Sequence, residues 1–282
     1  KTDVFRERAE YSAMRKAELE AARRAGRQGG GVETLRAIEG SLGPLHAVEA
    51  GVVVDLFLSY RAVSAWDEMI RLAGAMDQAL GETVLVREQL ALALNRVGRR
   101  DEAERVITSL IERRGPSSES CGILGRVYKD EWVEASAKGE SFRARGFLQQ
   151  AIDAYTSGFE ADPRDAYPGV NAVTLMELRD PPDPRRLELV PVVRYAVKRR
   201  MASGTPDYWD HATLVELAVL ARDEAAAGDA LSAALALVAE GWQAETTARN
   251  LRLINEARDR RGEGAPWALV IQRELERAAA ER

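Results

Sequence analysis

Two basic residues, Arg126 and Lys129, lie one helical turn apart and form the group in this sequence best suited to hold an anion. Arginine and lysine bind phosphate and carboxylate groups through charge-assisted hydrogen bonds, which are stronger than neutral ones. Asp130 is expected to flank the same surface, and Asn171 and Thr174 are expected close to the two cations. These residues predict a binding site for a phosphate or carboxylate group.

Ion pairs between repeats are the simpler alternative for the two cations. Arg126 could pair with Glu160, and Lys129 could pair with its neighbour Asp130 or with Glu177. Pairs of this kind are common on the surfaces of helical proteins and add little to stability. The sequence leaves both interpretations open.

A second group of polar and aromatic residues could complete the site. Its members are Tyr208, Trp209, His211, Thr247, Arg249 and Asn250. The aromatic rings could stack on a base, and the polar residues could close the groove against Arg126 if the chain curls. Aromatic residues in helical repeats also form cores, Asp207 or Asp210 could cap a helix, and Asn171 could join two helices by a hydrogen bond.

No group of residues in the sequence resembles a catalytic centre. A cysteine nucleophile needs an activating histidine, but Cys121 is expected at the start of a repeat helix, where a small buried thiol packs well. The two histidines, His46 and His211, lack the paired spacing of a metal site. Ser117 and Ser118 are typical of a helix cap. The sequence predicts a protein that is not an enzyme and uses no cofactor.

Composition restricts the possible partners. A net charge of -5 and a pI near 5.4 argue against a general nucleic-acid binder, which needs a basic surface. The most apolar runs, such as residues 52–58, are far too short to span a bilayer. A single cysteine excludes an intramolecular disulfide and fits a reducing compartment. We expect a cytoplasmic protein that binds neither nucleic acid nor membrane.

The chain repeats itself with the period of a tetratricopeptide array. Leu90 and Leu94 lie four residues apart, as do Leu124 and Tyr128, and the second pair follows the first by 34 positions. A second helical pattern and a proline-bearing turn follow each pair. This period, with two helices per unit, is the signature of tetratricopeptide repeats. We therefore predict an all-α, tetratricopeptide-like superhelix of antiparallel helix pairs.

Segments outside the repeats complete the predicted organisation. Residues 2–25 have the pattern of a charged helix, and the glycine run at 28–31 predicts a linker after it. We therefore expect an N-terminal helix and linker at 1–45 and a repeat domain at 46–282. A capping helix at 266–282 closes the predicted array.

The second helix pair contains an insertion. Leu94 to Ala103 spans nine positions, whereas the equivalent span in the second pair is 23. The extra residues fall around 131–146 and are expected to lengthen the first helix and to add a loop near 138–140. Insertions in helical repeats often lie on the binding face, so this segment is a second candidate docking surface.

Several strings of the sequence resemble one known family. They are CGILGRVYKD at 121–130, GFEADP at 158–163, DAYPGVNA at 165–172, YWDHAT at 208–213 and ETTARNL at 245–251. Together they resemble the TRAF-binding, tetratricopeptide-like domain of the apoptosis signal-regulating mitogen-activated kinase kinase kinases, and especially its bacterial relatives. The resemblance covers residues 55 to 254, most of the chain.

The resemblance implies a regulatory, non-catalytic role. In the animal kinases this domain helps to dock partners ahead of the kinase, and no kinase motif occurs in the present sequence. The bacterial relatives resemble parts of signalling or defence proteins, and they often adjoin TIR or caspase-like effector domains, which could precede Lys1.

Two functions are therefore expected. The favoured one is a docking module of a bacterial signalling or defence protein, which binds a partner protein or effector domain through its concave groove. The alternative that the resemblance implies is a sensor that binds an anionic, NAD-derived nucleotide in the same groove.

Overall fold

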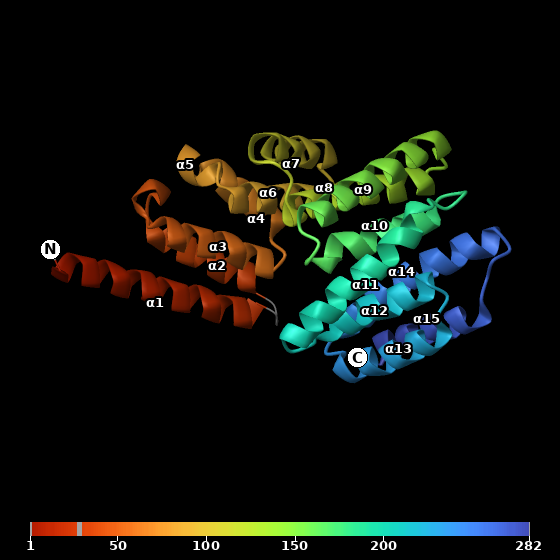
Figure 1. Ribbon diagram of the computed structural model, residues 1–282. Helices are drawn as coiled ribbons and strands as arrows, with labels where there is room; N and C mark the ends of the chain where they lie inside the picture. The colour runs from red at the N-terminus through yellow and green to blue at the C-terminus, as the bar shows by residue number, and fades with distance from the viewer. Residues whose placement is uncertain (1, 27–29, 282) are drawn as a thin grey trace. The chain divides into compact units, whose positions relative to one another are not determined.

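The computed structural model describes residues 2–26 and 30–281, and Figure 1 labels its helices. Every regular element in these two ranges is a helix, which confirms the all-α prediction. The chain divides into two compact units, residues 1–115 and 116–282. Each unit has its own hydrophobic core and is described by itself.

The first unit is a stack of helices. Its elements are α1 (Thr2–Gly26), α2 (Gly31–Leu42), the 3-10 turn η1 (Leu45–Ala47), α3 (Ala50–Ala62), α4 (Trp66–Ala75), α5 (Gln78–Gly81), α6 (Val84–Arg96) and α7 (Arg100–Arg114). α1 packs against α2 and α3, and α4 packs against α3 and α6. Val52 and Val53 are buried in α3, as expected for a helix between helices. Of the predicted glycine linker, Gln28 and Gly29 lie outside the described residues, whereas Gly30 has a φ of 78° directly before α2.

The second unit consists of helix pairs. They are α8 (Ser118–Ala137) with α9 (Ser141–Ala161), α10 (Ala166–Leu178) with α11 (Arg185–Ser203), α12 (Tyr208–Leu220) with α13 (Glu224–Leu237), and α14 (Gly241–Arg260) with α15 (Pro266–Ala280). Within this unit α10 contacts α8, α12 and α14, and α12 also contacts α14. The first helices of successive pairs therefore pack against one another, as they do in helical-repeat arrays.

A glycine lets the two long helices of the first pair in this unit approach closely. A Cβ atom on Gly125 would lie 2.7 Å from the ring of Tyr155, which is closer than van der Waals contact allows. Tyr155 and Ala151 are fully buried, and Tyr128 packs against the same core. The core predicted from the repeat spacing is thus confirmed.

The insertion is accommodated largely as we expected. The turn between the two helices falls at 138–140, as predicted, but it is short and contains Gly139 at a φ of 72°. The added residues instead extend both helices: α8 has 20 residues against 13 in α6, and α9 has 21 against 15 in α7. The predicted lengthening of the first helix and the predicted position of the turn are therefore confirmed, and the lengthening of α9 is the part that we did not predict. Residues 141–150 are rich in helix-forming types, and Ala144 and Leu148 gain burial by continuing the helix.

Side-chain caps fix where two of these helices begin. The Ser117 hydroxyl accepts a hydrogen bond from the Ser120 amide at 3.0 Å and starts α8. Asp207 and Asp210 form a reciprocal capping box at the start of α12, with hydrogen bonds of 3.1 and 3.0 Å. Both caps satisfy amide groups that have no partner inside the helix, and both confirm the sequence predictions.

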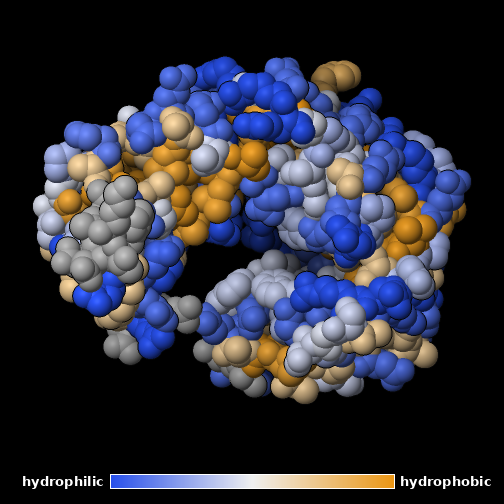
Figure 2. All heavy atoms as spheres, turned by 60° about the vertical axis from the view of Figure 1, so that its left-hand side comes forward, coloured by the Kyte–Doolittle hydropathy of each residue, from blue (hydrophilic) through white to orange (hydrophobic). Residues whose placement is uncertain are grey.

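Polar residues are prominent on one face of the molecule (Figure 2). On the face shown in Figure 2, hydrophilic residues cover most of the area and hydrophobic residues form smaller patches between them. Each helix in the described part of the chain is too short or too polar to serve as a transmembrane span.

Candidate binding site in the second unit

Lys129 and Asn171 connect the first two pairs of the unit. Lys129 extends from α8, and its Nζ donates a hydrogen bond to Asn171 Oδ1 on α10 at 3.3 Å. Asn171 Nδ2 in turn donates to the Tyr167 carbonyl oxygen at 2.9 Å. That second bond turns the amide oxygen toward Lys129, so Asn171 is the inter-helix hydrogen-bonding residue that one interpretation of the sequence predicted.

Glu216 on α12 is a buried carboxylate close to this lysine. Its side chain is 7% exposed, and its Oε1 accepts one hydrogen bond, of 3.0 Å, from Asn250 Nδ2 on α14. Sequence analysis missed Glu216. The available signal was a single acidic residue within the apolar run LVELAVL at 214–220, because a charge in such a run needs a partner when it is buried.

The pKa values of Lys129 and Glu216 are both shifted toward 7. Burial lowers the pKa of Lys129 to about 8. The charges of Arg126 and Arg249 also lower this pKa, whereas the charges of Glu216 and Asp130 raise it. A buried ammonium group is costly without full compensation.

Burial also raises the pKa of Glu216, to about 7. The hydrogen bond from Asn250, the charge of Lys129 and the nearby Thr174 hydroxyl favour the ionised form but do not outweigh burial. Perturbed groups of this kind collect at functional sites.

Thr174 adds an unfulfilled polar group to the cluster. Thr174 is 2% exposed, and its Oγ1 has no hydrogen-bond partner among the described residues. The hydroxyl lies near enough to Glu216 to favour its ionised form, but not in the geometry of a hydrogen bond. A buried hydroxyl without a partner costs free energy, and a bound polar group would remove that cost.

Arg126 and Arg249 bring positive charge to the cluster from two different helices. Arg126 is half-buried on α8. Burial alone would lower its pKa, but the neighbouring Tyr167, Tyr155 and Asp130 outweigh this effect and raise the pKa. Arg249 is exposed on α14 and still acts on Lys129. The geometry therefore brings together, around Glu216 of α12, seven predicted residues from α8, α10 and α14. They are Arg126, Lys129, Asp130, Asn171, Thr174, Arg249 and Asn250.

The remaining predicted residues make other hydrogen bonds and ring contacts, although the charge of Glu216 acts on the Tyr208 hydroxyl. The Tyr208 hydroxyl is 2.8 Å from Thr247 Oγ1 and donates to the Gln243 carbonyl at 3.1 Å, and both Tyr208 and Thr247 are buried. Their polar atoms are thus satisfied by the packing of α12 against α14. Trp209 is partly exposed and lies with its ring centroid 5.6 Å from that of Trp242.

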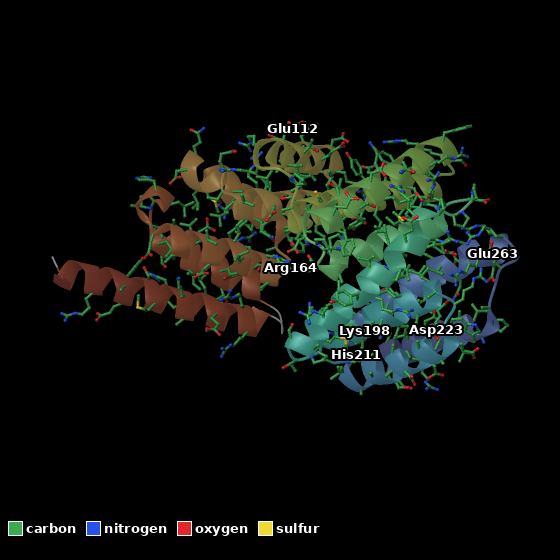
Figure 3. The ribbon with its side chains drawn as sticks, viewed as in Figure 1. Glu112, Arg164, Lys198, His211, Asp223 and Glu263 are labelled. Atoms are coloured by element: carbon green, nitrogen blue, oxygen red, sulfur yellow. The ribbon has the colours of Figure 1, made fainter. Side chains whose placement is uncertain are left out.

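His211, labelled in Figure 3, is half-buried on α12. Among the described residues no contact joins it to the Lys129 cluster. The described residues also contain no set of three side chains able to hold a metal ion. Cys121 is buried, and burial raises the pKa of its thiol, which disfavours the reactive thiolate.

A second buried carboxylate, Glu177 on α10, has a very different environment. It receives Arg258 and Arg261 at 2.8 Å each and Arg186 at 2.7 Å. Arg258 is itself 2% exposed and donates to the carbonyl groups of Val219 and Leu220 at the end of α12.

The hydrogen bonds in this group decide its charge state. Burial alone would raise the pKa of Glu177, but the hydrogen bonds and charges of Arg258 and Arg186 outweigh it and lower the pKa. The alternative pairing of Lys129 with Glu177 is therefore wrong, because arginines from α11 and from the end of α14 occupy this carboxylate.

Comparison with known proteins agrees with the fold. A thermophilic TPR protein of Thermus thermophilus resembles the structure with a TM-score of 0.52 at 16% sequence identity, over 72% of this chain and 99% of that chain. The array of helix pairs is thus a tetratricopeptide-like fold.

The family follows from the sequence itself. A model of the MAP3K TRAFs-binding domain matches residues 4–269, and the chain belongs to this family. The mitogen-activated protein kinase kinase kinase nsy-1 of Caenorhabditis elegans is 31% identical over 220 residues, which are 71% of this chain and 14% of that protein. Mitogen-activated protein kinase kinase kinase 15 of Mus musculus is 23% identical over 222 residues, 74% of this chain and 16% of that protein. The chain therefore spans only about a seventh of these relatives.

Proposed function

We propose that this chain is a non-catalytic docking and regulatory module of a signalling protein. It binds a partner protein, or an effector domain attached to it, through the surface formed by α8, α10, α12 and α14. The observation that carries this proposal is the match of a TRAFs-binding family to residues 4–269. The helical-repeat fold supports it, because stacked helix pairs offer extended surfaces for binding.

The setting that we propose is a bacterial signalling or defence protein of the cytoplasm, in which a TIR or caspase-like effector is the attached domain. Resemblance of the strings at 121–130 and 165–172 to bacterial members of the family supports this setting.

Affinity capture with the full-length protein tests the docking role. Arg126→Ala with Arg249→Glu should reduce recovery of the partner by about tenfold, since each removes positive charge from the proposed surface. Arg105→Glu, on the exposed side of α7, is the matched control and should leave recovery unchanged. Equal recovery by the control and the double variant would overturn the proposal.

A specific observation favours a second candidate, a sensor for an anionic nucleotide such as one derived from NAD. Arg126 and Arg249 both act electrostatically on Lys129, and the buried Thr174 hydroxyl lies beside Glu216 without a hydrogen bond of good geometry among the described residues. Three cations suit phosphate groups, and a buried hydroxyl suits a polar group of the ligand.

Thermal denaturation with ADP-ribose tests the sensor. A ligand at about 100 times its Kd stabilises the native state by about 2.7 kcal/mol through mass action, so the melting temperature should rise. Lys129→Met should abolish the rise, whereas Arg105→Glu should preserve it. An unchanged melting temperature for the wild type at millimolar nucleotide would refute the sensor and leave the docking role intact.

A further inference from the structure

A groove lies between α11 and the C-terminal end of α12, away from the Lys129 cluster. Its volume is about 480 Å³, within the range of pockets that hold a ligand or an anchoring side chain. Leu220 and Ala221 form the wall on the α12 side. The groove is therefore open, partly apolar and built on two helices.

The α11 side of the groove carries an unusual row of exposed apolar residues. Leu187, Pro191 and Tyr195 line it at intervals of four residues and so share one face of the helix. Leu187 is 68% exposed and Tyr195 is 66% exposed. Large side chains with this exposure, grouped along a groove, mark an interaction surface more often than isolated ones do.

The same helix carries concentrated positive charge. Among the residues of α11, Arg185, Arg186, Arg194, Lys198, Arg199 and Arg200 are basic, and only Glu188 is acidic. The whole chain, by contrast, has a net charge of -5. A basic helix on an acidic protein selects acidic partners and speeds their association.

Two of the three cations that line the groove are available to such a partner, whereas Arg186 is held by Glu177 at 2.7 Å. Lys198, labelled in Figure 3, is exposed and makes no ion pair with any described residue. Arg194 is held only loosely, at 3.8 Å from Asp223 and 3.4 Å from the Leu217 carbonyl oxygen. Reorienting these two side chains would therefore cost little.

From these observations we infer that the groove between α11 and α12 docks an acidic amphipathic helix of a partner protein. Apolar residues of that helix, spaced by three or four positions, enter the groove beside Leu187 and Tyr195, and flanking carboxylates pair with Arg194 and Lys198. This is recognition of a helix in a groove, in which apolar anchors give affinity and charges set the register. An anionic membrane fits less well, because the apolar side chains line a concave wall rather than a protruding face.

Selection from a displayed library of helical peptides tests this inference on the full chain. Peptides of about 16 residues, roughly four turns, should be enriched when apolar residues repeat at three or four positions between Asp or Glu residues. Fluorescence anisotropy should show that Lys198→Glu, and separately Leu187→Ser with Tyr195→Ser, weaken the selected peptides at least tenfold. The matched controls are Arg105→Glu for charge and Val270→Ser for an exposed apolar residue (54% exposed), and neither should change the affinity.

Several outcomes would overturn the inference. It fails if no peptide with this pattern is enriched, or if the selected peptides bind the Lys198 and Tyr195 variants as tightly as the wild type. It also fails if vesicles of phosphatidylserine bind with the same dependence on Lys198 and Tyr195. Finally, it fails if light scattering shows that Lys198 and Tyr195 hold two copies of the chain together. Arg249→Glu changes the proposed docking surface formed by α8, α10, α12 and α14, but it does not change this groove. It should therefore reduce recovery of the partner protein and leave the affinity for the selected peptides unchanged, which separates a failure of this inference from a failure of the proposed function.

Discussion

Two buried carboxylates on neighbouring helices of the second unit have opposite environments. Glu177 on α10 is surrounded by three guanidinium groups at 2.7 to 2.8 Å, and its pKa is lowered despite burial. Glu216 on α12 has one amide partner at 3.0 Å, and burial raises its pKa to about 7.

The difference separates structure from potential function. A buried charge with complete partners is held in one state and ties helices together, at high cost if a partner is lost. A buried charge with too few partners gains or loses its proton when its surroundings change slightly. Groups with this property are common in binding sites. We therefore attribute the Glu177 cluster to the fold, and we propose a binding role for the Glu216 cluster with Lys129 and Thr174.

The largest expected effect is on the Glu177 cluster. Arg258→Met should lower the free energy of unfolding by about 3–5 kcal/mol, because it leaves a buried carboxylate short of its most deeply buried partner. Urea denaturation followed by tryptophan fluorescence measures this, since four of the five tryptophans (132, 209, 242 and 267) belong to the second unit. Arg164→Met is the control: Arg164 also lies 2.8 Å from its carboxylate partner, Asp162, but that pair is exposed, and its loss should hardly change stability. Similar losses for both variants would remove the distinction between the clusters.

The Glu216 cluster should respond in the opposite direction. Glu216→Gln should raise the free energy of unfolding at pH 8 by about 1–3 kcal/mol, because the native fold no longer holds an under-partnered carboxylate. The folded pKa is raised from the ordinary 4.5 to about 7, so the contribution of Glu216 to stability is complete below the unfolded pKa and is lost as the pH rises through the folded pKa.

Urea denaturation at pH 4 and at pH 8 checks this sign. The gain of the Gln variant over the wild type should be present at pH 8 and should vanish at pH 4. A gain of equal size at both pH values would show that the titration of Glu216 is not its cause.

A double-mutant cycle sharpens the role of Lys129. Lys129 favours the ionised form of Glu216, so the effects of Lys129→Met and Glu216→Gln should not add. We expect a favourable coupling of about 0.5–3 kcal/mol at neutral pH, obtained from the unfolding free energies of the two single variants and the double variant. Additive effects would mean that the two groups titrate independently.

The smallest expected effect concerns Arg249. Because this side chain is exposed, Arg249→Ala should change the free energy of unfolding by less than about 0.5 kcal/mol. It should nevertheless raise the pKa of Lys129, since the charge of Arg249 lowers that pKa in the wild type. An NMR titration of the lysine side chains measures the shift, and an unchanged Lys129 would place Arg249 outside the cluster.

The sequence predicted the fold well because the repeat itself carries the information. Apolar spacing of four within a period of 34 residues specifies the helix pairs, and the buried Tyr155 and Ala151 follow from it. The longer α8 and the cap at Ser117 were also accessible, since both depend on local residues.

The candidate site was predicted only in part, because partners depend on how the array curls. Lys129 and Glu177 occupy equivalent repeat positions, yet Lys129 meets Asn171, while Glu177 meets Arg258, which lies 81 positions further along the chain. The repeat pattern predicts which face a residue occupies but not which distant helix approaches that face. The core role that one interpretation gave to Tyr208 agrees with its burial, but its pairing with Thr247 and the presence of Glu216 in the cluster escaped prediction for the same reason.

The titration of the two carboxylates measures the central claim most directly. In protein labelled with carbon-13 at glutamate carboxyl groups, NMR should give Glu216 a midpoint near pH 7, while Glu177 stays ionised down to at least its ordinary pKa of 4.5. The variants Glu216→Gln and Glu177→Gln assign the two signals. A midpoint for Glu216 at or below about 4.5 would show that its charge is fully compensated, and it would contradict the assignment of this cluster to binding.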